Sequence, residues 1–72
     1  MSYEETAIVE YLQSNPELGF ARREISRRAV KRKVFEEDPR WADAPLDALV
    51  ARGEVEITKS GLYQIKKSRW KP

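Results

Sequence analysis

The chain has 72 residues and a formal net charge of +2, from 14 basic and 12 acidic residues. A chain of this length forms one domain with a small core. It contains no cysteine and no histidine, which excludes disulfides, thiolate metal sites and the commonest general base. No phosphate-binding loop or nucleophile motif is present. We therefore expect a protein that is not an enzyme and needs no cofactor.

The charges fall into four blocks of alternating sign. Residues 1–20 carry four acids and no base, whereas residues 21–33 carry seven bases and one acid. Residues 34–56 are acidic again, and residues 57–72 carry five bases and no acid. Local fields influence partner choice more than net charge does. The two basic blocks are therefore candidate binding surfaces for an anionic partner.

The N-terminal residues predict a helix. Ser2 and Glu5 have the spacing of a capping box, which marks a helix start. The apolar residues that follow lie three and four positions apart and form one stripe: Ala7, Ile8, Tyr11 and Leu12. The helix should end at Ser14-Asn15-Pro16, because a proline disfavours the α conformation of the residue before it.

The basic run ARREISRRAVKRK, residues 21–33, is free of glycine and proline and favours helix. On a helical wheel, one apolar face consists of Ala21, Ile25 and Ala29. The row on roughly the opposite face consists of Arg23, Arg27 and Lys31. Val30 and Val34 lie nearer the basic row than the apolar face. We therefore expect a bend or break near Val30 to Lys33, followed by a second short helix that ends at Glu37.

A further helix is predicted after the boundary at Asp38-Pro39. Asp43 is its expected N-cap, and Pro45 is tolerated in the first turn. The apolar stripe consists of Leu46, Leu49 and Val50. Arg52 should lie in the last turn, and Gly53 should supply a left-handed residue after the helix.

The C-terminal segment predicts a β-hairpin whose register can be derived. A two-residue turn at Ser60-Gly61 would mix the two faces of the strands. A three-residue loop, residues 59–61, places Ile57 opposite Tyr63 and Val55 opposite Ile65. This register keeps the apolar pairs on one face and puts Gly61 where such loops need a left-handed residue. We therefore predict the three-residue loop.

Large apolar side chains are needed to complete so small a core. We expect Leu18 to enter it from the connection after the first helix. The aromatic residues expected in the core are Tyr11, Phe20, Phe35, Trp41 and Tyr63.

The order of helix, helix, short helix and C-terminal hairpin is that of a winged helix-turn-helix domain. The segment LDALVARGEVEITKSGLYQI, residues 46–65, resembles the last helix, glycine cap and wing of that family, and REI at residues 23–25 also resembles it. The resemblance implies a winged-helix domain over residues 1–66. Its fold would be mainly α, with three or four helices and a small two-stranded wing. Residues 67–72 are expected to form a mobile basic tail.

The chain departs from the family pattern in two places. The link KRKVFEEDPRWADAP is longer and more acidic than the usual tight turn. The third family helix normally presents polar and basic residues to the major groove, but Arg40 here accompanies Asp43 and Asp47. Carboxylates repel phosphates, so we expect weak reading of base sequence.

The expected partner is a nucleic acid, DNA rather than RNA, bound mainly through its phosphates by the basic second helix and the wing. The candidate contact residues are Arg22, Arg23, Arg27, Arg28, Lys31, Arg32, Lys33, Arg40, Lys59, Ser60, Lys66 and Lys67. Such a protein would act as a transcriptional regulator, as a monomer or homodimer. The alternative interpretation of the run is a solvated face that packs beside the acidic first helix.

A second functional class stays open, namely a protein–protein interaction module or an accessory subunit of a larger assembly. Its partner would bind the acidic segment Glu36–Asp47. The acidic N-terminus lacks a signal-peptide core and no apolar run approaches the ~20 residues of a membrane span. We therefore expect a cytoplasmic protein with no membrane partner.

Overall fold

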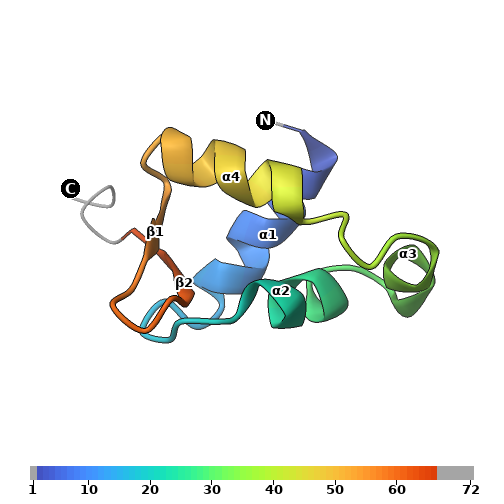
Figure 1. The fold of residues 1–72 in the computed structure, drawn as a ribbon, viewed down its shortest axis with the longest axis horizontal. Coiled ribbons are helices and arrows are strands. Elements are labelled where there is room, and N and C mark those ends of the chain that lie inside the picture. The colour runs from blue at the N-terminus through green and yellow to red at the C-terminus, as the bar shows by residue number, and fades with distance from the viewer. Residues whose placement is uncertain (1, 67–72) are drawn as a thin grey trace.

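Four helices and a C-terminal hairpin make up the part of the chain that the computed structural model describes, residues 2–66 (Figure 1). The elements are α1 (Tyr3–Gln13), α2 (Arg22–Arg28), α3 (Arg32–Glu37), α4 (Asp43–Ala51), β1 (Val55–Ile57) and β2 (Tyr63–Ile65). The predicted fold class is confirmed: the chain is mainly helical, and its layout is consistent with a winged helix. The predicted tail, with Lys67, lies outside the described residues.

The start of α1 is the predicted capping box. The Glu5 amide donates to Ser2 Oγ at 3.2 Å, and the Ser2 amide donates to the Glu5 carboxylate at 3.4 Å. These two bonds satisfy amides that have no partner inside the helix. The helix stops at Gln13, where the sequence predicted its end.

The basic run is broken into two helices, as predicted. Helix α2 ends at Arg28, and α3 begins at Arg32. The break begins at Ala29, the C-cap of α2, and Lys31 is the N-cap of α3. Lys31 therefore does not continue the row of Arg23 and Arg27 on one helix, and that part of the prediction is wrong.

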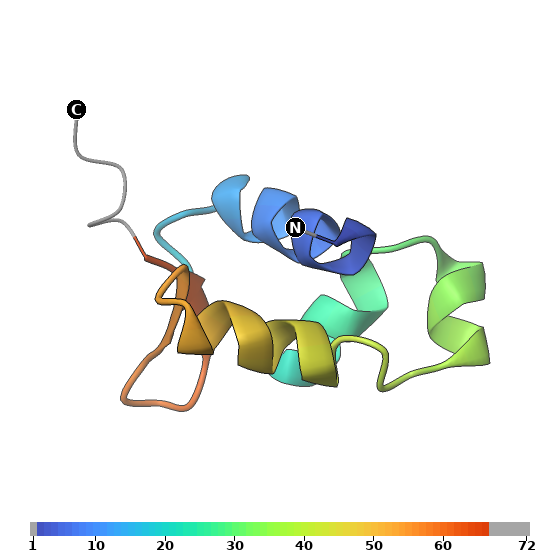
Figure 2. The same cartoon turned by 90° about the horizontal axis from the view of Figure 1, so that it is seen from above.

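The link after α3 is fastened to α2 by two hydrogen bonds. The Ser26 hydroxyl donates to the Pro39 carbonyl, and the Trp41 indole nitrogen donates to the Ser26 carbonyl at 2.7 Å. Ser26 is buried on α2, with 2% of its surface exposed. Because both ends of the excursion meet α2, α3 projects from one end of the molecule (Figures 1 and 2). No residue of α3 is buried.

The core lies between α1, α2, α4 and the hairpin. Its buried members are Ile8, Leu12, Ile25, Ala42, Leu46, Leu49, Val55, Tyr63 and Ile65. Tyr11, Phe20 and Trp41 pack against this cluster while half-buried, which confirms their predicted place. Tyr11 and Phe20 contact each other, with ring centroids 5.0 Å apart.

Three apolar residues lie outside the core, contrary to the predictions. Leu18 is 52% exposed, because the connection between α1 and α2 brings Phe20 inward instead. Phe35 is half-buried and does not belong to the core cluster, because α3 packs against the end of α2 and not against the core. Ala21 is exposed, since it is the N-cap of α2 and precedes the helical face of Ile25.

Helix α4 begins at Asp43, which the sequence predicted as its N-cap, so the helix starts one residue earlier than predicted. Asp43 is the first helical residue and Ala42 is the N-cap, without a side-chain cap bond. Ala42 is fully buried, so packing, and not capping, fixes this end of the helix. At the other end, Arg52 is the C-cap and Gly53 has φ +80°, the predicted left-handed conformation.

The hairpin has the predicted register. Val55 faces Ile65 and Ile57 faces Tyr63, and the Thr58 amide donates to the Leu62 carbonyl at 2.7 Å. The three-residue loop is therefore confirmed. Ile57 is nevertheless 52% exposed, so the apolar face of the strands extends beyond the core. We call β1, β2 and the loop between them the wing.

A single residue pairs with the free edge of β2. Phe20 and Tyr63 exchange two backbone hydrogen bonds, each 2.8 Å long. The connection between α1 and α2 therefore adds a third, one-residue strand to the wing. This contact holds the start of α2 beside β2.

Gly61 should be sensitive to substitution through backbone conformation alone. Its φ is +83°, and a Cβ built there would meet no atom within 4 Å. We expect Gly61→Ala to lower the free energy of unfolding by about 1 kcal/mol and Gly61→Asn by less, because asparagine tolerates this region better. Urea denaturation measures the effect. If Gly61→Ala lowers the free energy of unfolding no more than Ser60→Ala does at the neighbouring exposed position, the prediction is contradicted.

An ion pair joins α1 to the end of α4. Arg52 donates to the two carboxylate oxygens of Glu5 at 3.0 and 3.4 Å. The hydrogen bond from Arg52 is the main reason that the pKa of Glu5 lies below its ordinary value. A carboxylate with a lowered pKa stabilises the fold above its ordinary pKa, and this contribution is lost as the pH falls through the folded value.

We expect Glu5→Gln to make the protein less stable than the parent at neutral pH. Glutamine can keep the capping-box bond, so the loss reports the ion pair. The difference between the two proteins should shrink as the pH falls below about 4.3, the ordinary pKa of glutamate, because the parent then loses the same charge. Thermal melts across this pH range measure it. A difference that stays constant into acid would contradict the assignment.

Candidate nucleic-acid interface

Arg22, the first helical residue of α2, is bound inside the fold. Its guanidinium donates to Asp47 at 2.8 Å and to the Tyr63 hydroxyl, and it lies 3.4 Å from Asp43. It also stands over the Tyr63 ring, 5.3 Å from the centroid. The hydrogen bonds to the Tyr63 hydroxyl and to Asp47 raise the pKa of Arg22 above its ordinary value. Arg22 thus joins α2, α4 and β2.

Three other predicted contact residues form ion pairs on the surface. Arg28 lies 3.6 Å from Glu24, Arg32 lies 2.7 Å from Glu36, and Arg40 lies 3.3 Å from Asp43. The three arginine side chains are between 65% and 89% exposed. Exposed pairs of this kind are worth little, roughly 0–1 kcal/mol. Such arginines can exchange their carboxylate for an external anion at small cost.

The remaining basic residues of the prediction have no ion-pair partner among residues 2–66. They are Arg23, Arg27, Lys31, Lys33, Lys59 and Lys66. Arg23 and Arg27 are exposed and lie four residues apart, so they share the outer face of α2. Lys31 and Lys33 are exposed at the start of α3. Unpaired cations are thus concentrated on adjoining parts of α2 and α3.

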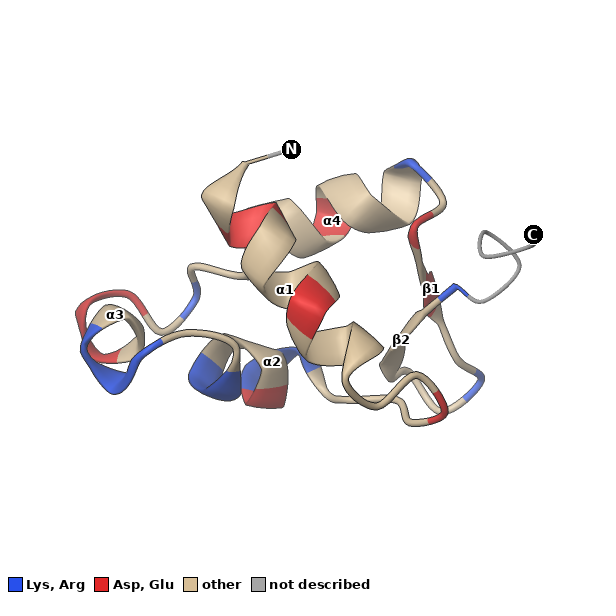
Figure 3. Ribbon diagram, turned by 180° about the vertical axis from the view of Figure 1, so that it is seen from behind, with Lys and Arg blue, Asp and Glu red and all other residues tan. Residues whose placement is uncertain are grey.

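The charges are segregated on the fold. Figure 3 shows basic segments of α2 and of the start of α3 along one edge, with acidic segments on α1, on α4 and from the end of α3 into the link that follows. One acidic residue, Glu24, interrupts the basic edge in the first turn of α2. We call the surface formed by Arg23, Arg27, Lys31 and Lys33 the basic edge.

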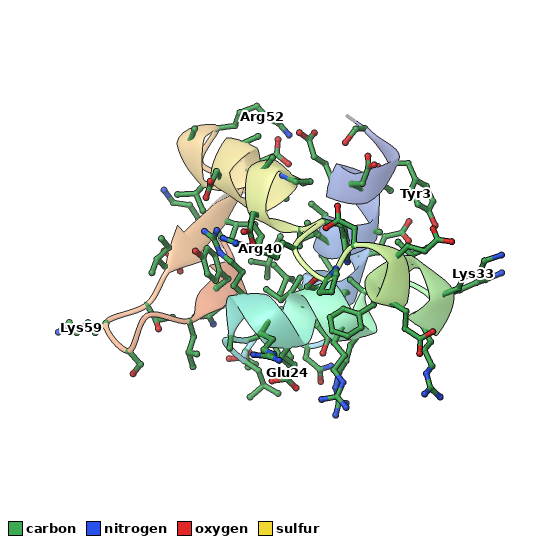
Figure 4. All side chains as sticks on the ribbon, turned by 45° about the vertical axis from the view of Figure 1, so that its right-hand side comes forward. Tyr3, Glu24, Lys33, Arg40, Arg52 and Lys59 are labelled. Atoms are coloured by element: carbon green, nitrogen blue, oxygen red, sulfur yellow. The ribbon has the colours of Figure 1, made fainter. Side chains whose placement is uncertain are left out.

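The wing does not adjoin the basic edge as closely as α3 does. Lys59, at the tip of the wing beside the exposed Ser60, and Lys33 on α3 point away from opposite ends of the molecule in Figure 4. Helix α2 lies between them (Figures 1 and 4). Lys66 is half-buried at the end of β2. A partner that contacts α3 and the wing together must therefore extend along α2.

The acidic first helix packs beside α2 without an ion pair to the basic run among the described residues. Among the described residues, no carboxylate of α1 forms an ion pair with α2 or α3, and Glu5 is paired with Arg52. The interpretation in which α1 neutralises the run therefore has no support in the ion pairs. The two Arg52 bonds are instead made at the opposite side of the molecule from Glu24 (Figure 4).

The acidic segment Glu36–Asp47 is not a single acidic surface. Glu36 pairs with Arg32, Asp43 lies beside Arg22 and Arg40, and Asp47 accepts from Arg22. The carboxylates at the start of α4 are therefore largely neutralised from within the chain. The surface that they present to a partner is less negative than the sequence suggests.

No protein-family model, curated protein or solved structure matches the chain. Interpretation of the site therefore depends on its geometry and charge. None of the helices described within residues 2–66 has the length and apolar character needed to cross a membrane.

The contacts of Arg22 and Ser26 were not apparent from the sequence. Arg22 is one of seven bases among thirteen residues, and its partners are defined only when the wing is placed beside α2. The position of Ile25 carries a usable signal, since a residue three positions before a buried one lies near the same helix face. That spacing would have separated Arg22 from Arg23.

Arg22 should contribute to stability, unlike its neighbour. We expect Arg22→Ala to lower the free energy of unfolding by about 1 kcal/mol, since the variant loses charge-assisted hydrogen bonds to Asp47 and Tyr63 from a side chain that is about one third exposed. Arg23→Ala removes the same charge from an exposed position and should change the free energy of unfolding by less than ~0.5 kcal/mol. Chemical denaturation compares the two variants, and equal effects would contradict the distinction.

Proposed function

We propose that this chain is a winged-helix protein, without enzymatic activity, that binds nucleic acid through phosphate contacts from the basic edge. The observation that supports the proposal is the segregation of paired and unpaired cations. Arg22 and Arg52 are used by acids of the same chain, whereas the basic edge has no ion-pair partner among residues 2–66. Exposed, unpaired and adjacent cations favour a polyanion, because binding releases condensed counterions.

The predicted contact residues then divide by role. Arg23, Arg27, Lys31 and Lys33 would contact phosphates directly, with Arg28 and Arg32 as exchangeable neighbours. Lys59, Ser60 and Lys66 would contact a partner long enough to pass along α2 to the wing. Arg22 would act by positioning α2 against α4 and β2, because its guanidinium is already bonded to Asp47 and Tyr63.

Sequence-specific reading would be weak. Specificity in the major groove needs side chains that match the donor and acceptor pattern of base edges. The start of α4 instead carries Asp43 and Asp47, which are bonded to arginines of the chain. DNA rather than RNA is the proposed polyanion, and transcriptional regulation is the process that such a protein would serve.

A protein partner is the second candidate function, and the position of α3 favours it. The helix projects from the molecule and buries none of its own residues. Helix α3 therefore offers a face that the chain itself does not use. A pull-down that loses all captured material after nuclease treatment would argue against this candidate.

The basic edge is tested by removing two unpaired charges. Arg23→Gln/Arg27→Gln should weaken binding of a labelled DNA duplex and reduce the slope of log affinity against log salt by about 1.8, which is about 0.9 for each lost phosphate contact. Fluorescence anisotropy across a salt series measures the slope. The parent protein must bind the duplex or its single strand at low salt; a folded parent that binds neither form overturns the proposal.

Arg52→Gln is the control for charge. It removes one positive charge at the end of α4, from an arginine that is paired with Glu5 and Glu54. We expect the salt slope of this variant to equal that of the parent. If this variant lost as much salt slope per removed charge as the double variant does, net charge, and not the basic edge, would control binding.

A further inference from the structure

Phe35 is an aromatic residue that the core does not use. It lies on α3, is half-buried, and is absent from both the core cluster and the residues packed against it. A ring of this size outside the core of a small domain forgoes burial that the domain needs. The surface around Phe35 is therefore a candidate binding surface.

Phe35 separates two open hollows whose walls are rich in arginine. The first, of about 560 Å³, is lined by Arg27, Arg28, Arg32, Phe35 and Glu36. The second, of about 500 Å³, lies on the side of Pro39 and Asp43 and also includes Arg22, Arg23 and Arg40. Both hollows open at the junction of α2 and α3, beside the basic edge.

The two hollows differ in the charge that they can offer. In the second, Arg22 is bonded to Asp47, Arg40 holds only an exposed surface pair, and Arg23 has no ion-pair partner among residues 2–66, so two of its three arginines are available. In the first, Arg27 has no ion-pair partner among residues 2–66. The other two arginines there, Arg28 and Arg32, hold only exposed surface pairs. The first hollow thus combines three available guanidinium groups with an aromatic side chain.

Aromatic and cationic side chains in one groove match the chemistry of a single strand. Bases in a duplex present only their edges, whereas an unpaired base presents a face that can stack on an aromatic ring or on a guanidinium plane. The phosphates of the same strand would meet the arginines. A duplex could use the arginines but could not reach Phe35 with a base face.

We propose that the corner between α2 and α3 binds single-stranded nucleic acid. One base stacks against Phe35, and the adjoining phosphates contact Arg27, Arg28 and Arg32. This inference rests on the proposed nucleic-acid function and narrows it to a preferred form of the partner. The acidic start of α4 agrees with it, because α4 is poorly suited to lie in the groove of a duplex.

The first test compares a labelled single strand of about 12 nucleotides with the duplex of the same sequence, at the same salt concentration. The parent should bind the single strand more tightly. Phe35→Leu keeps an apolar side chain but removes the aromatic face. It should weaken single-strand binding roughly tenfold, which is within the range of one lost base stack. Its affinity for the duplex should not change. Phe35→Tyr keeps the ring and should bind as the parent does.

Val34→Ala is the matched control on the same helix. Val34 is exposed and lines neither hollow, so its truncation should leave both affinities unchanged. Circular dichroism establishes that each variant is folded. Should Phe35→Leu fail to fold, photo-crosslinking of the parent to a strand containing 5-iodouracil gives an independent result, since the crosslinked peptide should contain Phe35.

The outcomes separate this inference from the broader proposal. Equal binding of single strand and duplex, with no effect of Phe35→Leu, overturns the inference and leaves phosphate binding intact. Binding of neither form overturns both. Competition by a mononucleotide as strong as that by the single strand, at equal nucleotide concentration, assigns the hollow to a free nucleotide and overturns the inference. A crosslink that maps away from α3 also overturns it.

Discussion

Arg22 is the side chain on which the arrangement of charge in this protein depends. Its guanidinium is shared by Asp47, Asp43 and Tyr63, so one residue connects α2 to α4 and to the wing. It also pairs with two carboxylates of α4, of which Asp47 is still 68% exposed. A helix turns about 100° per residue, so anchoring Arg22 inward directs Arg23 and Arg27 to the solvent. The inner contact and the basic edge are two consequences of the same helix orientation.

The second constraint is the pair of bonds between α2 and the link that follows α3. Ser26 and Trp41 fix the return of the chain at Pro39, so α3 forms an excursion that the core does not cover. This arrangement leaves Lys31 and Lys33 exposed at the start of α3 and Phe35 between two hollows. The long acidic link that departs from the winged-helix pattern is therefore what creates the surface to which we assign function. Of its acids, Glu36 and Asp43 pair with arginines of the chain.

The distinction between paired and unpaired cations is more informative than their number. The chain has 14 lysines and arginines, yet several of them act inside the fold or in surface pairs. Arg52 supports the contact between α1 and α4 through its ion pair with Glu5. That role is internal to the fold. Only cations free of internal partners contribute their full field to an incoming polyanion. The basic edge is defined by this criterion, and the hollow beside Phe35 adds chemistry that charge alone lacks.

Much of the fold was determined by the sequence itself, because the relevant forces are local. The capping box at Ser2, the break in the basic run and the register of the hairpin all follow from spacing, periodicity and glycine conformation within a few residues. Each prediction was correct for that reason. The half-buried position of Phe35 outside the core could not be obtained in this way, because burial depends on which elements lie nearby.

The tertiary structure alone decided the candidate site. In the sequence, seven bases between residues 21 and 33 carry the same charge, and helical spacing alone does not show their partners. Their roles separate only when β2 brings Tyr63 to Arg22 and the link returns to Ser26. These contacts join residues 41 and 13 positions apart, beyond the range of helical periodicity. Local physics thus determined the helices and the hairpin, whereas long-range packing determined which charges remain available to a partner.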